Sequence, residues 1–259
     1  MSSFVIKLIA IITMLCDHSG DAILGRFSFL NVIGRIAFPL FCFQIVIGYK
    51  HTKNVNKYFL RLFLFGIISQ IPFSLFTYLY LGRFDMLNVF FTLAIGLLAI
   101  YVLDVFPIKY KAFALIIDIV LMILAEFAQT DYGWFGVCLI ICIYLFYKDK
   151  SLNLIDQNSV AKVSNLSQNP VVAKKHENSI TYFNNNVLFT IVFLGLIVIK
   201  YSNYIALGSY NLALLLIAGT FFSIVFMLLY NGKKGPSLKY LFYAFYPVHL
   251  LILAMLNYI

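Results

Sequence analysis

The sequence predicts an all-α membrane protein, a bundle of about nine transmembrane helices with its N-terminus in the cytoplasm. Of the 259 residues, 63% are hydrophobic and 11% are charged, whereas a soluble domain is about 25% charged. Mean hydropathy is +0.94. Stretches such as 189–199 and 212–230 are apolar on every face, which favours helices over the alternating pattern of a transmembrane barrel. The composition excludes a soluble enzyme, a disordered chain and a disulfide-stapled secreted domain.

The first half of the chain contains four expected spans. A helix rises about 1.5 Å per residue and a bilayer core is about 30 Å thick, so a span needs about 20 apolar residues. The first stretch, 4–24, ends in polar residues and lacks a small-residue cleavage site, so we expect it to be retained. The next three lie at 32–49, 59–80 and 87–106.

The second half of the chain adds five spans, of which the sixth and seventh in chain order are short. They lie at 112–129, 133–147, 186–200, 206–230 and 238–257. All nine belong to one expected domain, 1–259.

The segment 148–185 interrupts this pattern. It is rich in Asn, Ser, Lys and Val, which predicts a flexible cytoplasmic loop. Lys174 and Lys175 can touch anionic membrane lipid from this loop.

The basic residues determine the orientation. With the N-terminus inside, only Arg26, Arg35, Arg83 and Lys200 of the 19 Lys and Arg residues lie on the outer face, as the positive-inside rule requires. The net charge of +9 is therefore a topology signal, and we expect no nucleic-acid partner. Nor do we expect a metal, because Cys138 and Cys142 share a helix face without the further ligands that zinc needs.

Ionisable side chains inside spans are the first candidates for a functional site, because each costs about 2.5–3.5 kcal/mol to insert. Lys7 and His18 stand 11 residues apart in the first span. That spacing is close to three helical turns, so both lie on one face about 16 Å apart. Asp118 and Glu126 lie deep in the fifth span, where they line a cavity or pair with Arg35 or a Tyr hydroxyl.

His249 lies in the last span, within FYPVHLLIL. It and His18 are expected at similar depth, and His18 is flanked by Asp17. An imidazole pKa near 6.5 suits general-base chemistry, and a carboxylate can orient the ring. The alternatives are a proton relay and a purely structural pair.

A basic stripe connects the second and third spans. Lys50, Lys53, Lys57 and Arg61 recur at spacings of three and four residues. The positive-inside rule accounts for the connection but not for the continuation of charge into the span at Arg61. An anionic ligand such as the phosphates of a nucleotide accounts for both, and the two interpretations stay open.

The sequence resembles the TraX family. The resemblance rests on KLIAIITMLCDHSG, GRIAFPLF in the second span, YGWFGVCLII and FYPVHLLIL, and covers nearly everything except 148–185. It implies an integral protein of the bacterial cytoplasmic membrane, since the namesake of the family is linked to N-terminal acetylation of a conjugative pilin. Gln70 and Ser74 stand where the family commonly has acidic residues.

A wider likeness implies a mechanism. The Lys7–His18 spacing and the stripe ending at Arg61 resemble the motifs of acyltransferase-3 membrane enzymes, which move acyl groups from cytoplasmic acyl-CoA to an outer acceptor. We therefore expect an acetyltransferase that uses acetyl-CoA. Lys7, Lys53, Lys57 and Arg61 are expected to hold the donor.

The remaining site residues have expected roles at the reaction centre. His18 or His249 is the base, Asp17 orients a partner, and Arg35 and Glu126 bind the acceptor, which is a peptide, glycan or small molecule. Two other classes remain: a proton-coupled transporter or flippase, which would not bind CoA, and a non-catalytic assembly factor, which would tolerate loss of both histidines.

Overall fold

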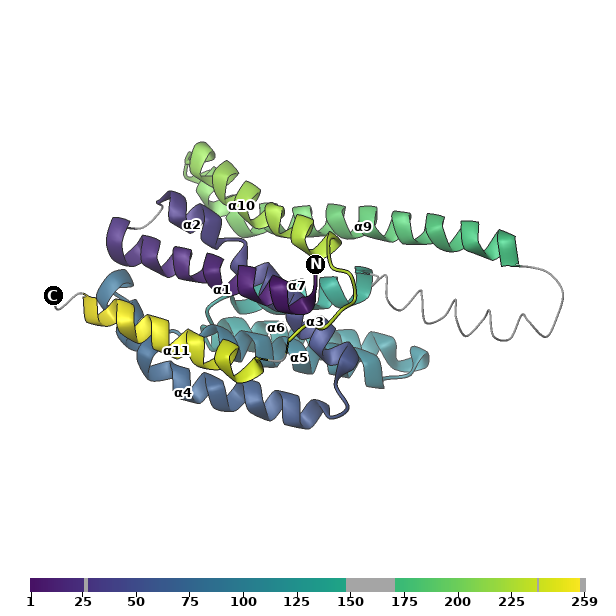
Figure 1. Ribbon diagram of the computed structural model, residues 1–259, viewed down its shortest axis with the longest axis horizontal. Coiled ribbons are helices and arrows are strands. Elements are labelled where there is room, and N and C mark those ends of the chain that lie inside the picture. Colours follow the sequence, from purple (N-terminus) through teal and green to yellow (C-terminus); the bar gives the residue numbers. More distant parts are fainter. Residues whose placement is uncertain (26–27, 148–170, 237, 257–259) are drawn as a thin grey trace.

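The chain folds as an elongated helical bundle. A computed structural model describes residues 1–25, 28–147, 171–236 and 238–256. Over these residues the secondary structure is helical, apart from an isolated bridge between Leu87 and Thr130. Figure 1 shows the helices lying along the long axis of the bundle. The all-α prediction is confirmed.

The first half of the chain forms four of the expected spans. The second span is made of two helices in succession, α2 and α3, and the first ends in a π-helical turn, η1. The bounds are α1 Ser3–Ser19, η1 Gly20–Leu24, α2 Phe29–Gly34, α3 Ala37–His51, α4 Val55–Leu81 and α5 Val89–Val105. Side-chain oxygens of Ser2, Asn54 and Asn88 cap α1, α4 and α5 by accepting from backbone amides, which satisfies donors that the helices leave free.

In the second half, a helix overlaps each of the other five expected spans. After the short η2 (Ile108–Tyr110) come α6 Lys111–Phe127, α7 Gly133–Phe146, α9 Val171–Ala206, α10 Tyr210–Leu228 and α11 Lys239–Leu256. Within the described residues, five segments are long and apolar enough to cross a membrane: 3–24, 29–51, 55–81, 186–206 and 210–228. The helices at 89–105, 133–146 and 240–256 are apolar but shorter.

One boundary differs from the expectation. Of the loop expected over 148–185, residues 148–170 lie outside the described part of the chain, and α9 begins at Val171. Neither Gly nor Pro occurs from Val171 to Asn186, so no residue stops the apolar helix from extending backward through this polar stretch.

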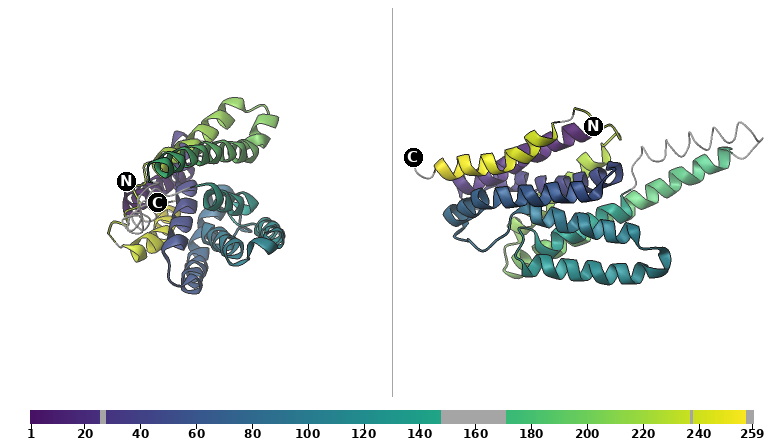
Figure 2. Two further views of the ribbon diagram at one scale, coloured as in Figure 1. Left: turned by 90° about the vertical axis from the view of Figure 1, so that its right-hand side faces the viewer. Right: turned by 90° about the horizontal axis from the view of Figure 1, so that it is seen from below.

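Helices α1, α4 and α11 run in the same direction and lie together (Figures 1 and 2). The start of α1 is tied to the connection before α11, because Ser3 and Phe4 donate backbone hydrogen bonds to the carbonyls of Lys233 and Lys234. We call this end of the bundle, with the connections 52–54 and 229–238, the basic end. It is the end that the positive-inside rule assigns to the cytoplasm.

The opposite end is held by polar contacts between two connections. Leu87 donates to the carbonyl of Gln129 and accepts from the amide of Asp131. Next to this contact, the side-chain carbonyl of Gln70 accepts hydrogen bonds from the backbone and side-chain amides of Asn88. Gln70 therefore fixes the start of α5.

Gly219 lies where α10 packs closely on α2, and its substitution tests this contact. A Cβ added there would lie 2.3 Å from the carbonyl oxygen of Val32, whereas a Cβ at Gly195 on α9 would meet nothing within 4 Å. We expect Gly219→Ala to lower stability by about 1–3 kcal/mol, seen as a lower melting temperature in detergent. Gly195→Ala is the control and should be neutral or slightly stabilising. Equal melting temperatures would contradict the α2–α10 contact.

Candidate functional site

A cavity of about 390 Å³ extends from the basic end into the bundle. Thr52 and Lys234 belong to its outer part, at connections between helices, while Met14, Val89 and Tyr246 line it deeper along α1, α5 and α11. We call it the basic cavity. Aromatic and aliphatic side chains form most of its wall, which suits a ligand with a long, weakly polar segment.

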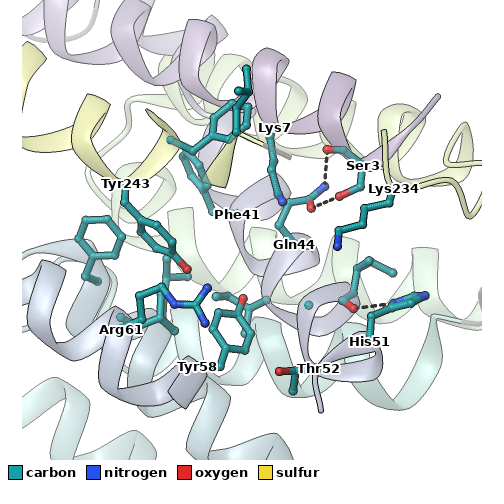
Figure 3. Close-up of a pocket in the computed structure, with 18 of the residues that line it drawn as sticks. Ser3, Lys7, Phe41, Gln44, His51, Thr52, Tyr58, Arg61, Lys234 and Tyr243 are labelled. Carbon is teal, nitrogen blue, oxygen red and sulfur yellow. Dashed lines mark hydrogen bonds between the residues drawn. The ribbon is translucent and has the colours of Figure 1, made fainter. Parts of the chain in front are cut away.

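Three cationic side chains from three different elements face this space. Figure 3 shows Lys7 of α1, Arg61 of α4 and Lys234 of the 229–238 connection extending toward it. The Arg61 guanidinium lies 5.9 Å from the centre of the Tyr58 ring. Among the described residues that line the cavity there is no carboxylate, so their positive charge is not neutralised from the cavity wall and favours an anionic ligand.

The expected donor-binding residues divide into two groups. Lys7 and Arg61 line the cavity, whereas Lys53 and Lys57 are exposed and do not. The face of α4 that lines it carries Tyr58, Arg61 and Leu62, and Lys57 precedes that face. The sequence assigns Lys234 to the cytoplasmic face but does not place it at the donor site. Backbone hydrogen bonds from Ser3 and Phe4 hold its connection beside the cavity, and sequence patterns do not reveal such contacts.

His18 and His249 meet at the inner end of this region. The Nδ1 of His18 lies 2.7 Å from the Nε2 of His249, and the ring centroids are 5.0 Å apart. Tyr246, which lines the cavity, has its ring 6.3 Å from that of His18 and 5.8 Å from that of His249. The two histidines expected at similar depth therefore form one pair.

The hydrogen-bond partners assign the tautomers of this pair. The Nδ1 of His249 lies 2.8 Å from the carbonyl oxygen of Phe245. A carbonyl only accepts, so His249 donates through Nδ1, and its neutral ring has the lone pair on Nε2. His18 then donates to that lone pair through Nδ1, which leaves the lone pair of His18 on Nε2. In this arrangement the Nε2 of His18 is the nitrogen of the pair that can accept a proton, and His249 holds the His18 ring through its Nδ1–H.

Asp17 does not orient either histidine. Its carboxylate pairs with the Arg35 guanidinium at 2.5 Å and accepts from the Asn31 amide at 3.1 Å. A Cβ on Gly34 would lie 2.3 Å from that of Asp17, so the glycine of GRIAFPLF allows α1 and α2 to approach. Asp17, expected to orient a partner at the reaction centre, instead forms a charge pair with Arg35.

A second, more polar pocket of about 620 Å³ lies at the opposite end. Glu126, Asp131, Lys200 and Arg83 line it. We call it the polar pocket. Glu126 accepts from the backbone amide of Trp134 at 3.2 Å, and Glu126 therefore lies at this pocket and not beside Arg35. Burial raises the pKa of Asp131 to about 6, while Lys200 and Arg35 act to lower it.

The groups available for metal binding are few. Within the described ranges no cluster of three His, Cys, Asp or Glu residues could hold a metal ion. Asp118 is buried at 2% exposure, and neither of its carboxylate oxygens has a hydrogen-bond partner within the described structure. It belongs to neither the basic cavity nor the polar pocket.

Comparisons with known proteins give one family and two curated relatives. The family model described as "TraX protein" matches residues 2–257. A "Probable fimbrial assembly protein FimC, serogroup H1" of Dichelobacter nodosus is 28% identical over 272 residues, covering 97% of this chain and 94% of that protein. An "Uncharacterized protein RP591" of Rickettsia prowazekii (strain Madrid E) is 25% identical over 148 residues, 56% of each. No solved structure gives a significant match.

The Asp17–Arg35 pair gives a test of this geometry. Asp17→Asn and Arg35→Gln each leave an unpaired charge, and each should lower stability by up to about 3 kcal/mol. The double variant should lose less than the sum, because it leaves no charge behind. Melting temperatures of the four proteins in detergent measure this, and strictly additive losses would mean that the two residues do not act as a pair.

Proposed function

The chain belongs to the TraX family, and from this premise we propose that it is a membrane-embedded acyltransferase. It transfers an acetyl group from acetyl-CoA, bound at the basic end, to a nucleophilic acceptor that reaches the histidine pair from the opposite end. One observation carries the proposal: a cavity with three unneutralised cations leads from the predicted cytoplasmic end toward a base with a free lone pair.

The donor fits the charge and shape of the basic cavity. The phosphates of CoA bind Arg61 and Lys234 near the surface, and Lys7 contacts the donor deeper along α1. The pantetheine arm is long and weakly polar, as the aromatic and aliphatic wall of the cavity requires. Lys7 and His18 are about 16 Å apart along their helix, which is the order of length of that arm. Lys53 and Lys57 add positive potential outside the cavity.

The chemistry follows from the tautomers. The Nε2 of His18 takes the proton from the acceptor amine or hydroxyl as that group attacks the thioester carbonyl carbon. The tetrahedral intermediate then collapses, the C–S bond breaks, and the imidazolium returns the proton to the sulfur of CoA. His249 accepts the Nδ1–H of His18 throughout and stabilises the positive ring.

The acceptor comes from the polar pocket. This pocket carries both signs of charge, from Glu126, Asp131 and Lys200. Arg35, paired with Asp17, lies between the pocket and the histidine pair in the proposed path of the acceptor. A relative is named for fimbrial assembly, and the family resemblance points to pilin acetylation. The acceptor is therefore a peptide amine of a surface-fibre subunit, with a surface glycan hydroxyl as the second class to test.

The transporter alternative rests on one observation, the polar groups that continue beyond the histidine pair through Arg35 to the polar pocket. Binding and turnover of acetyl-CoA separate the two functions. A transporter with this proton path would neither bind acetyl-CoA in the basic cavity nor release free CoA from it.

The two histidines should differ in a kinetic test. His18→Asn keeps a donor at the Nδ1 position but removes the base, so the release of CoA from acetyl-CoA should fall by about 10²–10⁴-fold. His249→Gln keeps an acceptor for the Nδ1–H of His18 and should lose much less. The measurement is free thiol released by purified protein in nanodiscs. If His249→Gln loses more than His18→Asn, the two roles are reversed.

The cavity cations should act on donor binding. Arg61→Gln removes a charge from the cavity wall, so we expect KM for acetyl-CoA to rise by about tenfold, equivalent to about 1.4 kcal/mol, with kcat nearly unchanged. Lys57→Gln removes the same charge one helical turn away, outside the cavity, and is the matched control. An equal rise in KM for both variants would show that general surface charge, and not the cavity, determines the affinity.

A further inference from the structure

Tyr246 connects the basic cavity with the histidine pair. It is 3% exposed, lines the cavity, and packs its ring against both His18 and His249. Tyr246 is therefore a side chain that both lines the cavity and contacts the histidine pair.

The Tyr246 hydroxyl lacks a hydrogen bond of normal geometry. Among the described residues that line the basic cavity, it is the only one with a fully buried side-chain oxygen in this condition. A buried polar group left without a partner costs about 1–3 kcal/mol. This hydroxyl therefore needs a partner, and a bound ligand in the cavity can supply it.

The first amide of α5 faces the same hydroxyl. The Asn88 side chain accepts from the Phe90 amide and its backbone carbonyl accepts from the Phe91 amide, whereas the Val89 N–H lies within interaction range of the Tyr246 hydroxyl. Amides at a helix N-terminus carry partial positive charge. An oxygen that faces an N–H acts as an acceptor, so the Tyr246 proton is left to be donated to another group.

We propose that Tyr246 is a catalytic residue that donates a hydrogen bond from its Oη to the carbonyl oxygen of the acyl thioester. This inference rests on the proposed acyltransferase function and adds a site that binds the developing oxyanion. The Val89 amide at the start of α5 polarises the hydroxyl. The donor is in place before the reaction, which is how oxyanion sites lower barriers.

The step balances as follows. The acceptor nucleophile bonds to the carbonyl carbon and gives its proton to the Nε2 of His18, while the C=O π electrons move to oxygen. The resulting oxyanion accepts the hydrogen bond of Tyr246. When the C=O bond re-forms, the C–S bond breaks and the CoA sulfur takes the proton from His18. Tyr246 keeps its own proton throughout.

Tyr246→Phe is the direct test. It removes only the oxygen, so we expect kcat for CoA release from acetyl-CoA to fall by about 10²–10³-fold, with little change in KM or melting temperature. Tyr240→Phe is the matched control, since Tyr240 lies on the same helix, is exposed and does not line the basic cavity, and it should keep parental kcat. Full-length protein in nanodiscs is used for all variants.

Val89 allows a second test of the same arrangement. Val89→Pro deletes the amide hydrogen at the first position of α5, where proline is tolerated, and Asn88 already has the extended backbone (φ −68°, ψ 167°) that precedes proline. We expect a smaller fall in kcat, about tenfold. Val89→Ala shortens the side chain but keeps the amide, so its kcat should exceed that of Val89→Pro.

The outcomes separate this inference from the proposed function. If the parent protein neither binds nor turns over acetyl-CoA, the acyltransferase proposal fails. If the parent is active and Tyr246→Phe matches it, Tyr246 is a packing residue and the inference is wrong. An acetyl group found covalently on Tyr246 by mass spectrometry would also overturn it, because the hydroxyl would then be a nucleophile and not a donor.

Discussion

A bilayer offers no water to polar groups, so a polar group inside the spans is costly unless it finds a partner within the protein. The Asp17–Arg35 pair meets this constraint through Asn31, and the His18–His249 pair meets it through a backbone carbonyl. Each solution needs helices from different parts of the chain to be held in register. The close approach of α1 to α2 at Gly34 and the alignment of α1 with α11 follow from this requirement.

The need to satisfy polar groups inside the membrane also explains which features of the fold and the site the sequence predicts. The expected spans all overlap with helices, because apolar length and the scarcity of charge are local properties. The alignment of Lys7 with His18 is a local property too, since both residues lie on α1. The pairing of His18 with His249, 231 residues away in the chain, depends on helix packing, and helical phase alone left the base unassigned. The carbonyl of Phe245 determines the tautomer of His249, and the proposed role of His18 as the base rests on that tautomer.

The parts of the site that sequence reasoning missed each depend on how the elements of the structure pack against one another. Lys234 reaches the basic cavity because backbone hydrogen bonds fold the 229–238 connection onto the start of α1, and Lys57 falls outside because of its angular position on α4. Tyr246 is one of 18 tyrosines in a chain that is 18% aromatic, and its residue type does not distinguish it. It is marked only by an unsatisfied hydroxyl beside the Val89 amide, and sequence patterns do not report hydrogen-bond satisfaction.

In the proposed reaction, the position of the histidine pair between two openings determines what crosses the membrane. Arg61 and Lys234 bind the phosphates of CoA at the basic end, so only the acyl group and its thioester reach His18. The proton that His18 takes from the acceptor leaves with the CoA thiol on the side where the donor bound. The acyl group therefore moves toward the opposite end while one proton moves toward the basic end. A base with one free lone pair, held by a second histidine that accepts only its Nδ1–H, is suited to this exchange because the same nitrogen takes the proton from the acceptor and gives it to the CoA sulfur.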